Sequence, residues 1–524
     1  MKIERILSTR RNMITGSLLR LFQMLAPFVM RSLIIREMGE QYLGLNSFFT
    51  SILQVLNLAE LGVGAAMVYS MYKPIAEDDR DALCALIGLY RKYYRVIGLV
   101  VAALGLALAP FLPHLVKSEL PADLNLYTLY FMNLGATVLS YWLFAYRTSL
   151  LTAMQRNDVL NLILLVFQIL QYSLQFYIVL RLKNYYLYVG AVLLCQVLNN
   201  ICGAIVTTRL YPEIQPRGQV PPERRREITG HVKDLFLSNI GGVVLGSADT
   251  LVISSVLGLS ALAIYQNYFF IVSSIYGFVE ILLNSMLAGI GNAMVKETKE
   301  KSYEIFRKLT FLFTALVFTC MCCFAGLFQP FMTLWMGEEY LLPYGMVVSF
   351  CLYFMVYEYT RFFNIFKSAA GAWHQDRFRP LISAAINLTL NLITVRYWRL
   401  YGILWSTIIA LTAIELPWLV HNIFTILYDR RHLAGYLRKL LIFCLGGLAA
   451  WGITMLLTQR IHLNTWAAFL VDGILSVAIP AAIYLTFYRK HEEYHAGMSL
   501  IDKATNHRLP FRRLYNAEST VQQE

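Results

Sequence analysis

Fourteen stretches of mostly apolar residues, separated by short polar segments, run the length of this 524-residue chain. Most are close to the length of about 20 residues that a helix needs to cross a hydrocarbon core about 30 Å thick. The stretches are continuous rather than alternating, so they indicate helices and exclude a strand barrel. We predict membrane-spanning helices at 13–35, 43–70, 96–116, 124–146, 158–180, 186–208, 236–256, 261–294, 309–333, 343–366, 380–395, 402–426, 440–458 and 466–488.

The basic residues between these stretches alternate by side. Of the 45 Lys and Arg residues, 35 lie in the even-numbered gaps and the two termini, 7 lie in the odd-numbered gaps, and 3 lie inside predicted helices. Cytoplasmic loops collect Lys and Arg because carrying these charges across a bilayer is costly. The pattern predicts a multi-pass protein of the bacterial inner membrane with both termini in the cytoplasm. The net charge of +13 then reflects topology, and we expect no nucleic-acid partner.

The chain contains no stretch long and polar enough for a soluble domain. We expect an N-terminal six-helix lobe, a basic and Pro-rich cytoplasmic linker, a C-terminal six-helix lobe, two extra transmembrane helices and a cytoplasmic tail. Their ranges are 1–208, 209–235, 236–426, 427–488 and 489–524.

Two short motifs of the first half recur in the second half. Asn46-Ser-Phe-Phe49 returns as Asn267-Tyr-Phe-Phe270, and the segment 62–68 (GVGAAMV) returns as 289–295 (GIGNAMV). Each half begins inside and holds six stretches, so the repeat is parallel, which is a recurring plan among transporters. Chance similarity between apolar sequences is the alternative explanation.

The first predicted helix carries charge where lipid would penalise it. At 100° per residue, Arg20, Gln23 and Arg31 fall on one face together with Gly16 and other polar or small residues. Ionisable groups in such a position usually face a cavity or a partner. Two guanidinium groups in a water-filled cavity would favour phosphate, because each planar fork binds two oxygens. The alternative is that each Arg pairs with a neighbouring acid.

Acidic and amide side chains also lie inside the predicted helices. We predict that several of them line a substrate-binding cavity with the residues of the first helix. Glu358 and Arg361 are three residues apart and are expected to neutralise each other locally. The predicted cavity residues are Arg20, Gln23, Arg31, Asn57, Glu60, Asp249, Glu280 and Asn284.

Motifs of catalysis and metal binding are missing. The sequence has no GxxxxGK[ST], HExxH or GxSxG segment, and most of its eight Cys residues lie inside predicted helices. We therefore expect that the protein is not an enzyme and that it has no catalytic residue, metal site or cofactor. Coupling to a H⁺ or Na⁺ gradient or to the membrane potential is left open.

The sequence resembles the polysaccharide flippase family of the multidrug/oligosaccharidyl-lipid/polysaccharide exporter superfamily. The likeness is carried by the segment 38–46 (MGEQYLGLN), by 57–64 (NLAELGVG), and by 238–240 (SNI) with 249–254 (DTLVIS) and 264–268 (IYQNY). It covers the first twelve predicted helices, and these motifs are more specific for the family than for a substrate.

The resemblance implies a fold and a function. The fold is an all-α polytopic membrane protein of about 14 helices, with two pseudo-symmetric six-helix lobes in a V around a central cavity and two C-terminal helices. The function is translocation of a polyprenyl-diphosphate-linked oligosaccharide from the inner to the outer leaflet by alternating access. The partners would be the lipid-linked oligosaccharide, membrane lipids and other membrane proteins of polysaccharide assembly.

Three other functions compete with this interpretation. A cation-coupled drug or metabolite exporter of the same fold would favour a cavity of acids and aromatics, which Arg20 and Arg31 oppose. A membrane-embedded polysaccharide polymerase or ligase is expected to need a sizeable outward loop, and the predicted outward loops hold about ten residues or fewer. A structural scaffold would not need charge in its first helix.

Overall fold

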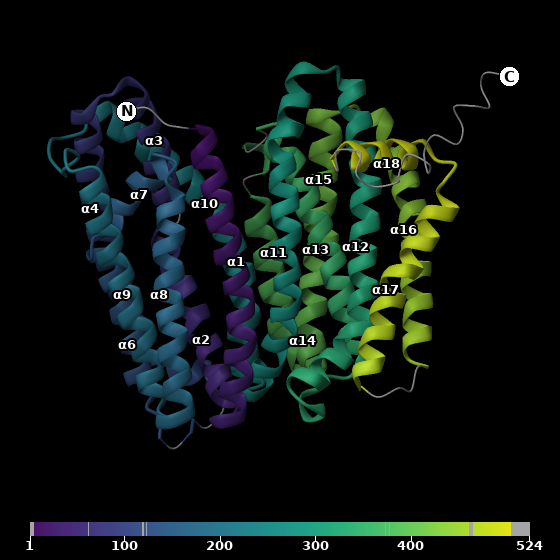
Figure 1. Cartoon of the computed structure of the whole chain (residues 1–524), viewed down its shortest axis with the longest axis horizontal. Helices are drawn as coiled ribbons and strands as arrows, with labels where there is room; N and C mark the ends of the chain where they lie inside the picture. The colour runs from purple at the N-terminus through teal and green to yellow at the C-terminus, as the bar shows by residue number, and fades with distance from the viewer. Residues whose placement is uncertain are drawn as a thin grey trace. The chain divides into compact units, whose positions relative to one another are not determined.

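The computed structural model describes residues 5–60, 62–117, 120–121, 123–371, 374–376, 378–460 and 465–504. Within these ranges every regular element is helical, which confirms the predicted all-α class (Figure 1). The helices are α1 (Arg5–Glu37), α2 (Glu40–Leu56), α3 (Val63–Glu77), α4 (Arg80–Leu108), α5 (Leu112–Leu115), α6 (Leu126–Trp142), α7 (Ala145–Ala153), α8 (Asn157–Tyr177), α9 (Tyr185–Leu210), α10 (Pro222–Val256), α11 (Leu259–Lys296), α12 (Lys299–Trp335), α13 (Tyr344–Ala369), α14 (Arg379–Ala410), α15 (Leu416–Asn422), α16 (Leu433–Thr458), α17 (Thr465–Phe487) and α18 (Glu492–Ala504).

Most predicted apolar stretches coincide with helices, but 43–70 and 124–146 are each interrupted, and 380–395 and 402–426 lie on one helical segment, Arg379–Leu427. Nine segments of the described chain are long and apolar enough to cross a membrane, so the protein is a multi-pass membrane protein. Their bounds are Arg11–Glu37, Arg80–Leu115, Asn157–Leu182, Tyr185–Leu210, Leu259–Met294, Lys299–Trp335, Arg379–Leu427, Arg430–Thr458 and Trp466–Phe487. The total of fourteen crossings stays a prediction.

Several of these helices begin at a polar side chain that caps them. Asp79 accepts a hydrogen bond from the backbone N–H of Ala82 at the start of α4. At the starts of α6 and α9, the side chains of Asn125 and Asn184 each accept a hydrogen bond from the backbone N–H three residues later. Such caps satisfy backbone donors that have no partner inside the helix. The short polar segments between apolar stretches therefore fix where these helices start.

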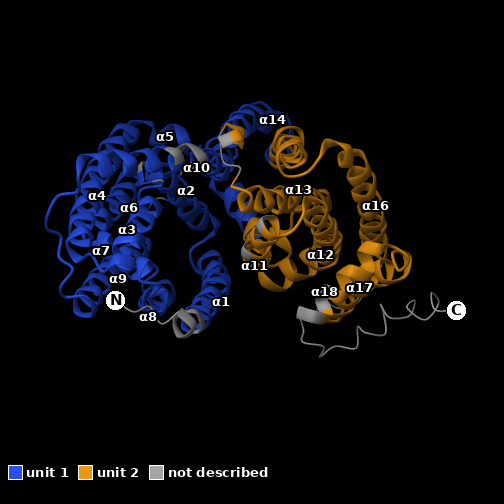
Figure 2. Ribbon diagram, turned by 90° about the horizontal axis from the view of Figure 1, so that it is seen from above, with its two compact units in different colours: residues 1–268, 380–403 blue, residues 269–379, 404–524 orange. Residues whose placement is uncertain are grey.

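The chain packs into two compact units (Figure 2). Unit 1 comprises residues 1–268 and 380–403, and unit 2 comprises residues 269–379 and 404–524. Helices α11 and α14 each contribute to both units. Unit 1 contains all of α10, which the sequence had assigned to the second lobe, so the division into two six-helix lobes stays a prediction.

One predicted helix of unit 1 is broken where a close contact requires it. The stretch 43–70 divides into α2, a 3-10 turn at Asn57–Glu60, and α3. Gly62 adopts φ +87°, a left-handed conformation that side chains other than glycine rarely tolerate. A Cβ on Gly62 would lie 2.6 Å from Cβ of Leu235 in α10. The break therefore depends on a glycine that lets α10 approach.

Unit 2 is built around α12, which packs against α13, α16, α17 and α18. Its core is aromatic. The ring of Phe306 stacks on Phe362 and Tyr436 with ring centroids 6.1 and 4.9 Å apart, and meets Phe366 edge-on at 4.7 Å. Such pairs add to the stability that burial of their apolar area already provides.

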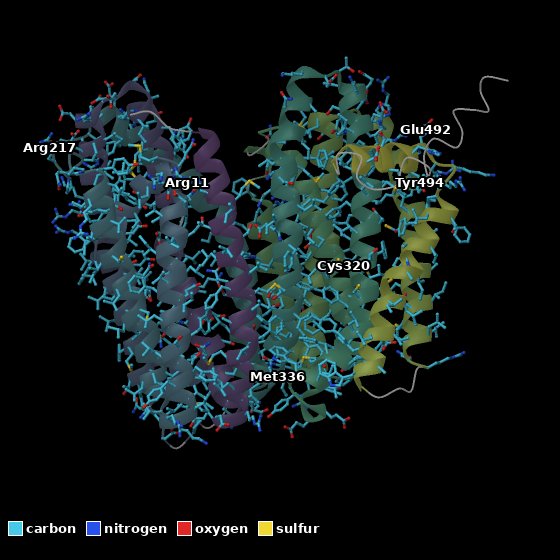
Figure 3. The ribbon with its side chains drawn as sticks, viewed as in Figure 1. Arg11, Arg217, Cys320, Met336, Glu492 and Tyr494 are labelled. Atoms are coloured by element: carbon cyan, nitrogen blue, oxygen red, sulfur yellow. The ribbon has the colours of Figure 1, made fainter. Side chains whose placement is uncertain are left out.

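Helix α18 packs on unit 2 in a region that the sequence predicts as a polar tail. Glu493 is only 2% exposed and accepts hydrogen bonds from Arg307 of α12 and Lys439 of α16. Burial alone would raise the pKa of the Glu493 carboxyl, but these two cations hold that pKa below its usual value. Glu492 and Tyr494 of this helix lie at the opposite end of unit 2 from Met336 (Figure 3).

Candidate functional site

The basic residues of α1 occupy different environments. Arg20 is exposed, whereas Gln23 and Arg31 are half-buried. The Nη1 of Arg31 donates a hydrogen bond to Oδ1 of Asn267 in the unit 1 part of α11, at 3.1 Å. The Asn267 side chain is fully buried. The structure therefore places one of the two predicted guanidinium groups inside unit 1 and holds it there with an amide.

Glu60 lies at the helix break and is held by hydroxyl groups. Tyr94 donates a hydrogen bond to Oε1 of Glu60, and Tyr141 donates to Oε2 at 2.9 Å. The Tyr141 hydroxyl also lies 2.9 Å from Oδ1 of Asn57, and Tyr90 donates to Tyr94 at 3.0 Å. These tyrosines lie on α4 and α6 and are buried. The structure thus brings together the predicted site residues Asn57 and Glu60.

Asp249 is bound by an amide of α14. Asn391 of α14 donates a hydrogen bond to Oδ1 of Asp249 at 2.7 Å and a second to Oδ1 of Asn387 at 3.3 Å. Asn387 and Asn391 are fully buried. Asn387 and Asn391 therefore form a buried polar strip of α14 inside unit 1.

In unit 2 the predicted ion pair between Glu358 and Arg361 is wrong. Arg361 pairs with Glu280 of α11, with Nη2 and Oε1 3.0 Å apart, rather than with Glu358 of its own helix. Glu358 is fully buried, and neither of its carboxyl oxygens has a hydrogen-bond partner within the described residues. Arg361 keeps 22% of its side chain exposed, so it reaches outward to α11 while Glu358 faces inward. Asn284, one turn beyond Glu280, is exposed.

A buried ion cluster in unit 2 was not predicted from the sequence. It lies where α13 ends and α14 begins and contains two cations and two acids. Nζ of Lys367 lies 2.6 Å from Oδ2 of Asp376, and Arg379 binds both oxygens of Asp376 at 2.7 and 2.8 Å. Arg379 also pairs with Glu415, and Asn422 donates to Asp376 at 3.4 Å.

The charge state of this cluster is set by competing effects. Burial would raise the pKa of the Asp376 carboxyl, but hydrogen bonds and charges from Arg379 and Lys367 outweigh burial and lower that pKa. The side chains of Lys367, Asp376, Arg379 and Glu415 are all less than a tenth exposed. The four charges balance, so the cluster fastens the α13–α14 connection to the segment 411–415 without a net buried charge.

The contacts described above give the sequence-predicted site residues different partners. Asn57 and Glu60 share the Tyr141 hydroxyl, Arg31 contacts Asn267, Asp249 contacts Asn391, and Glu280 pairs with Arg361. Their joint role in a substrate cavity stays a prediction. Within the part of the chain that is described, no three His, Cys, Asp or Glu residues are grouped so as to hold a metal ion.

The partners that sequence analysis missed are mostly neutral. Asn267 was visible only as part of a repeated motif, and Tyr90 and Tyr94 only as an i, i+4 pair in the basic segment before the third apolar stretch. Nothing in the sequence connects Tyr141 with Glu60.

Known proteins resemble this chain in sequence and in fold. The profile of the family described as "Polysaccharide biosynthesis protein" matches residues 9–287, which is over half of the chain. A comparison with curated protein sequences gives no match.

Solved structures share the fold at low sequence identity. The chain is similar to a lipid II flippase, MurJ, in an inward closed conformation, with 14% identity, a TM-score of 0.62, and coverage of 91% of this chain and 99% of that one. It is also similar to a multidrug resistance MATE transporter in an inward-facing conformation, with 11% identity, a TM-score of 0.58, and coverage of 80% and 99%. A multidrug resistance MATE transporter in an outward-facing conformation is similar as well, with 14% identity, a TM-score of 0.51, and coverage of 82% of this chain and 96% of that one.

The sequence match and the fold lead to the same group of proteins. The matched region contains α1 to α10 and most of α11, hence Arg31, Glu60, Asp249 and Asn267. The structural likeness extends beyond it over most of the chain. The chain is a member of the polysaccharide biosynthesis protein family and has the fold of the superfamily that includes the lipid II flippase and the MATE transporters.

Proposed function

We propose that the protein is a flippase that moves a polyprenyl-diphosphate-linked oligosaccharide from the inner to the outer leaflet of the bacterial inner membrane. Family membership and a fold shared with a lipid II flippase support this function. Alternating access to a central cavity would carry the polar head group while the polyprenyl tail stays in lipid. Both termini would lie in the cytoplasm, as the distribution of Lys and Arg predicts.

The observation that carries the proposal is the environment of Arg31. This guanidinium lies inside unit 1, where Asn267 binds it, and the Glu60 carboxylate is turned to Tyr94 and Tyr141 instead. A cation kept within an apolar helix is costly and usually serves the substrate path. A planar guanidinium suits the oxygens of a diphosphate, and a neutral amide fixes its orientation without cancelling its charge.

We further propose that directional transport is coupled to a H⁺ or Na⁺ gradient or to the membrane potential. Carboxylates inside apolar helices, such as Glu60 and Asp249, support a coupled ion. The chain would perform no catalysis, in keeping with a family and a fold of transporters. Other membrane proteins of polysaccharide assembly would supply its substrate and take up its product.

The test is transport of a fluorescent lipid-linked oligosaccharide by the full-length protein in proteoliposomes. Arg31→Gln should lower the transport rate roughly 10- to 100-fold, the amount that losing a charged hydrogen bond implies. Arg31→Lys should keep part of the rate because it retains the charge but loses the fork. Arg36→Gln is the matched control, since Arg36 is exposed at the end of the same helix.

Two results would contradict the proposal. In one, Arg31→Gln transports at the rate of the unchanged protein. In the other, the proteoliposomes move organic cations but not the lipid-linked oligosaccharide, which would favour an exporter. Protein abundance and the gel-filtration profile of each variant separate a transport defect from misfolding.

A further inference from the structure

A cavity of about 540 Å³ lies in unit 1 between α3, α4, α10 and the segment before α10. These elements all belong to unit 1 (Figure 2). Arg217, at the edge of this segment, lies at the same end of unit 1 as Arg11 of α1 (Figure 3). We call this cavity the α4–α10 pocket; its lining residues used below are Leu89, Lys92, Tyr93, Val96, Arg225 and Thr229.

The charge of the α4–α10 pocket is positive. Among the described residues that line it, the charged ones are Lys92 and Arg225, and none is a carboxylate. Tyr93 and Thr229, whose hydroxyls lie 3.2 Å apart, add polar groups between α4 and α10. The acids of this part of α10, Glu223 and Glu227, line a separate cavity of about 530 Å³ against α3. Helix α10 thus directs its acids and Arg225 to different cavities.

One wall of the pocket is apolar and continues along α4. Leu89, Val96 and Ile97 lie on the same helix face, at i, i+7 and i+8. Val96 is 57% exposed, and the exposed side continues through Val100 and Leu104, at 40% and 50%. The pocket therefore combines a basic rim with an open apolar stripe.

The position of the pocket matches the polar boundary of a membrane. Lys92 lies four residues before the apolar stretch predicted at 96–116, so its ammonium group lies at head-group depth and the stripe lies in the hydrocarbon. Basic pockets between helices at this depth bind the phosphates of anionic lipids.

We infer that the α4–α10 pocket binds an anionic lipid whose head group carries a phosphate. Lys92 and Arg225 bind the phosphate, the hydroxyls of Tyr93 and Thr229 hydrogen-bond the head group, and the chain lies along the exposed stripe of α4. A bilayer phospholipid and a polyprenyl phosphate share this chemistry. This site is separate from Arg31, and its occupancy does not depend on the proposed transport function.

Equilibrium binding to the purified full-length protein in phosphatidylcholine nanodiscs tests the inference. The probes are fluorescent phosphatidylglycerol, polyprenyl phosphate, and inorganic pyrophosphate without lipid. The double variant Lys92→Gln/Arg225→Gln should weaken binding of phosphatidylglycerol roughly 30-fold, from about 1 kcal/mol per basic residue. Arg226→Gln/Lys233→Gln is the matched control, since both side chains are exposed and neither lines the pocket.

A second variant tests the apolar wall. Val96→Asn should weaken binding of both lipids and leave competition by inorganic pyrophosphate unchanged. Stronger binding of phosphatidylglycerol identifies an anionic bilayer phospholipid as the ligand, and stronger binding of polyprenyl phosphate identifies a polyprenyl lipid. Each of three results would overturn the inference. The two double variants could lose equal affinity for phosphatidylglycerol, pyrophosphate could bind as tightly as either lipid, or neither lipid could bind more tightly than phosphatidylcholine. Because no transport is measured, none of these results bears on the proposed flippase activity.

Discussion

Replacing Asp376 by Asn should destabilise unit 2 strongly. Asp376 accepts hydrogen bonds from Lys367 and from two nitrogens of Arg379, and all three side chains are less than a tenth exposed. The variant removes the acid that pairs with both Lys367 and Arg379, while Arg379 keeps its pair with Glu415. Removing one partner of a buried ion pair costs about 3–5 kcal/mol, because the remaining charge stays desolvated without compensation.

The pH dependence of this contribution follows from the lowered pKa of Asp376. A carboxyl whose pKa is lower in the folded state stabilises the fold above its unfolded pKa, which is about 3.9. This stabilisation is lost as the pH falls through the folded value. Between about pH 5 and 8 the cost of Asp376→Asn should therefore be constant.

The assay is unfolding of the detergent-solubilised protein by denaturant, followed by Trp fluorescence. Asp429→Asn is the matched control, because its ion pair with Arg431 is exposed and such pairs contribute about 0–1 kcal/mol. The double variant Lys367→Met/Asp376→Asn restores charge balance and should cost less than Asp376→Asn alone. A loss for Asp376→Asn no larger than that of the control would refute the reasoning.

Three further predictions concern the helix break, the C-terminal helix and the topology. Gly62→Ala should cost at least about 1 kcal/mol in the same assay, from the left-handed φ and the close approach of α10, whereas Gly135→Ala, with open space around it, should cost little. Glu493→Gln should release α18 and speed its proteolysis. Acid should do the same to the unchanged protein, because the stabilisation from Glu493 is lost as the pH falls through the lowered pKa of its carboxyl. Equal proteolysis rates for the variant and the unchanged protein would contradict this prediction. An impermeant thiol reagent added outside should label a Cys placed at Glu338 and miss one at Arg225, in a background without the native Cys residues; the reverse labelling would refute the orientation.

The helices could be predicted from the sequence because an apolar run depends on the local chain alone. Their breaks were not predicted. The stretches 43–70 and 124–146 were each expected to form one helix, but the first is interrupted at Gly62 and the second at Phe144, with φ 87° and 63°. The Phe144 side chain is 44% exposed, and a left-handed conformation is rare for so bulky a residue. The sequence therefore carries no local signal for this break.

The candidate site was harder to predict, because partners come from distant helices. Spacing indicated that Glu358 and Arg361 would pair, but Arg361 turns to Glu280 on α11. Three-residue spacing permits a contact without requiring it, and a partner on another helix competes. The buried cluster around Asp376 was missed for a related reason. Three of its members lie in the polar segment 367–379, where charge normally indicates solvent, and Glu415 comes from a later apolar helix.

The charge around Arg31 bears on whether unit 1 suits an anion, and Glu60 is one of the acids predicted to line the same cavity. Both oxygens of Glu60 are occupied by tyrosine hydroxyls, from Tyr94 on α4 and Tyr141 on α6, whereas Arg31 is bound by Asn267 on α11. Hydroxyl donors satisfy a carboxylate without requiring a cation, so Glu60 can remain inside unit 1 and leave Arg31 its charge. A direct Glu60–Arg31 pair would have given a neutral pair and no attraction for a diphosphate. These partners of Glu60 and Arg31 therefore support the proposal that unit 1 accepts the anionic head group of the substrate.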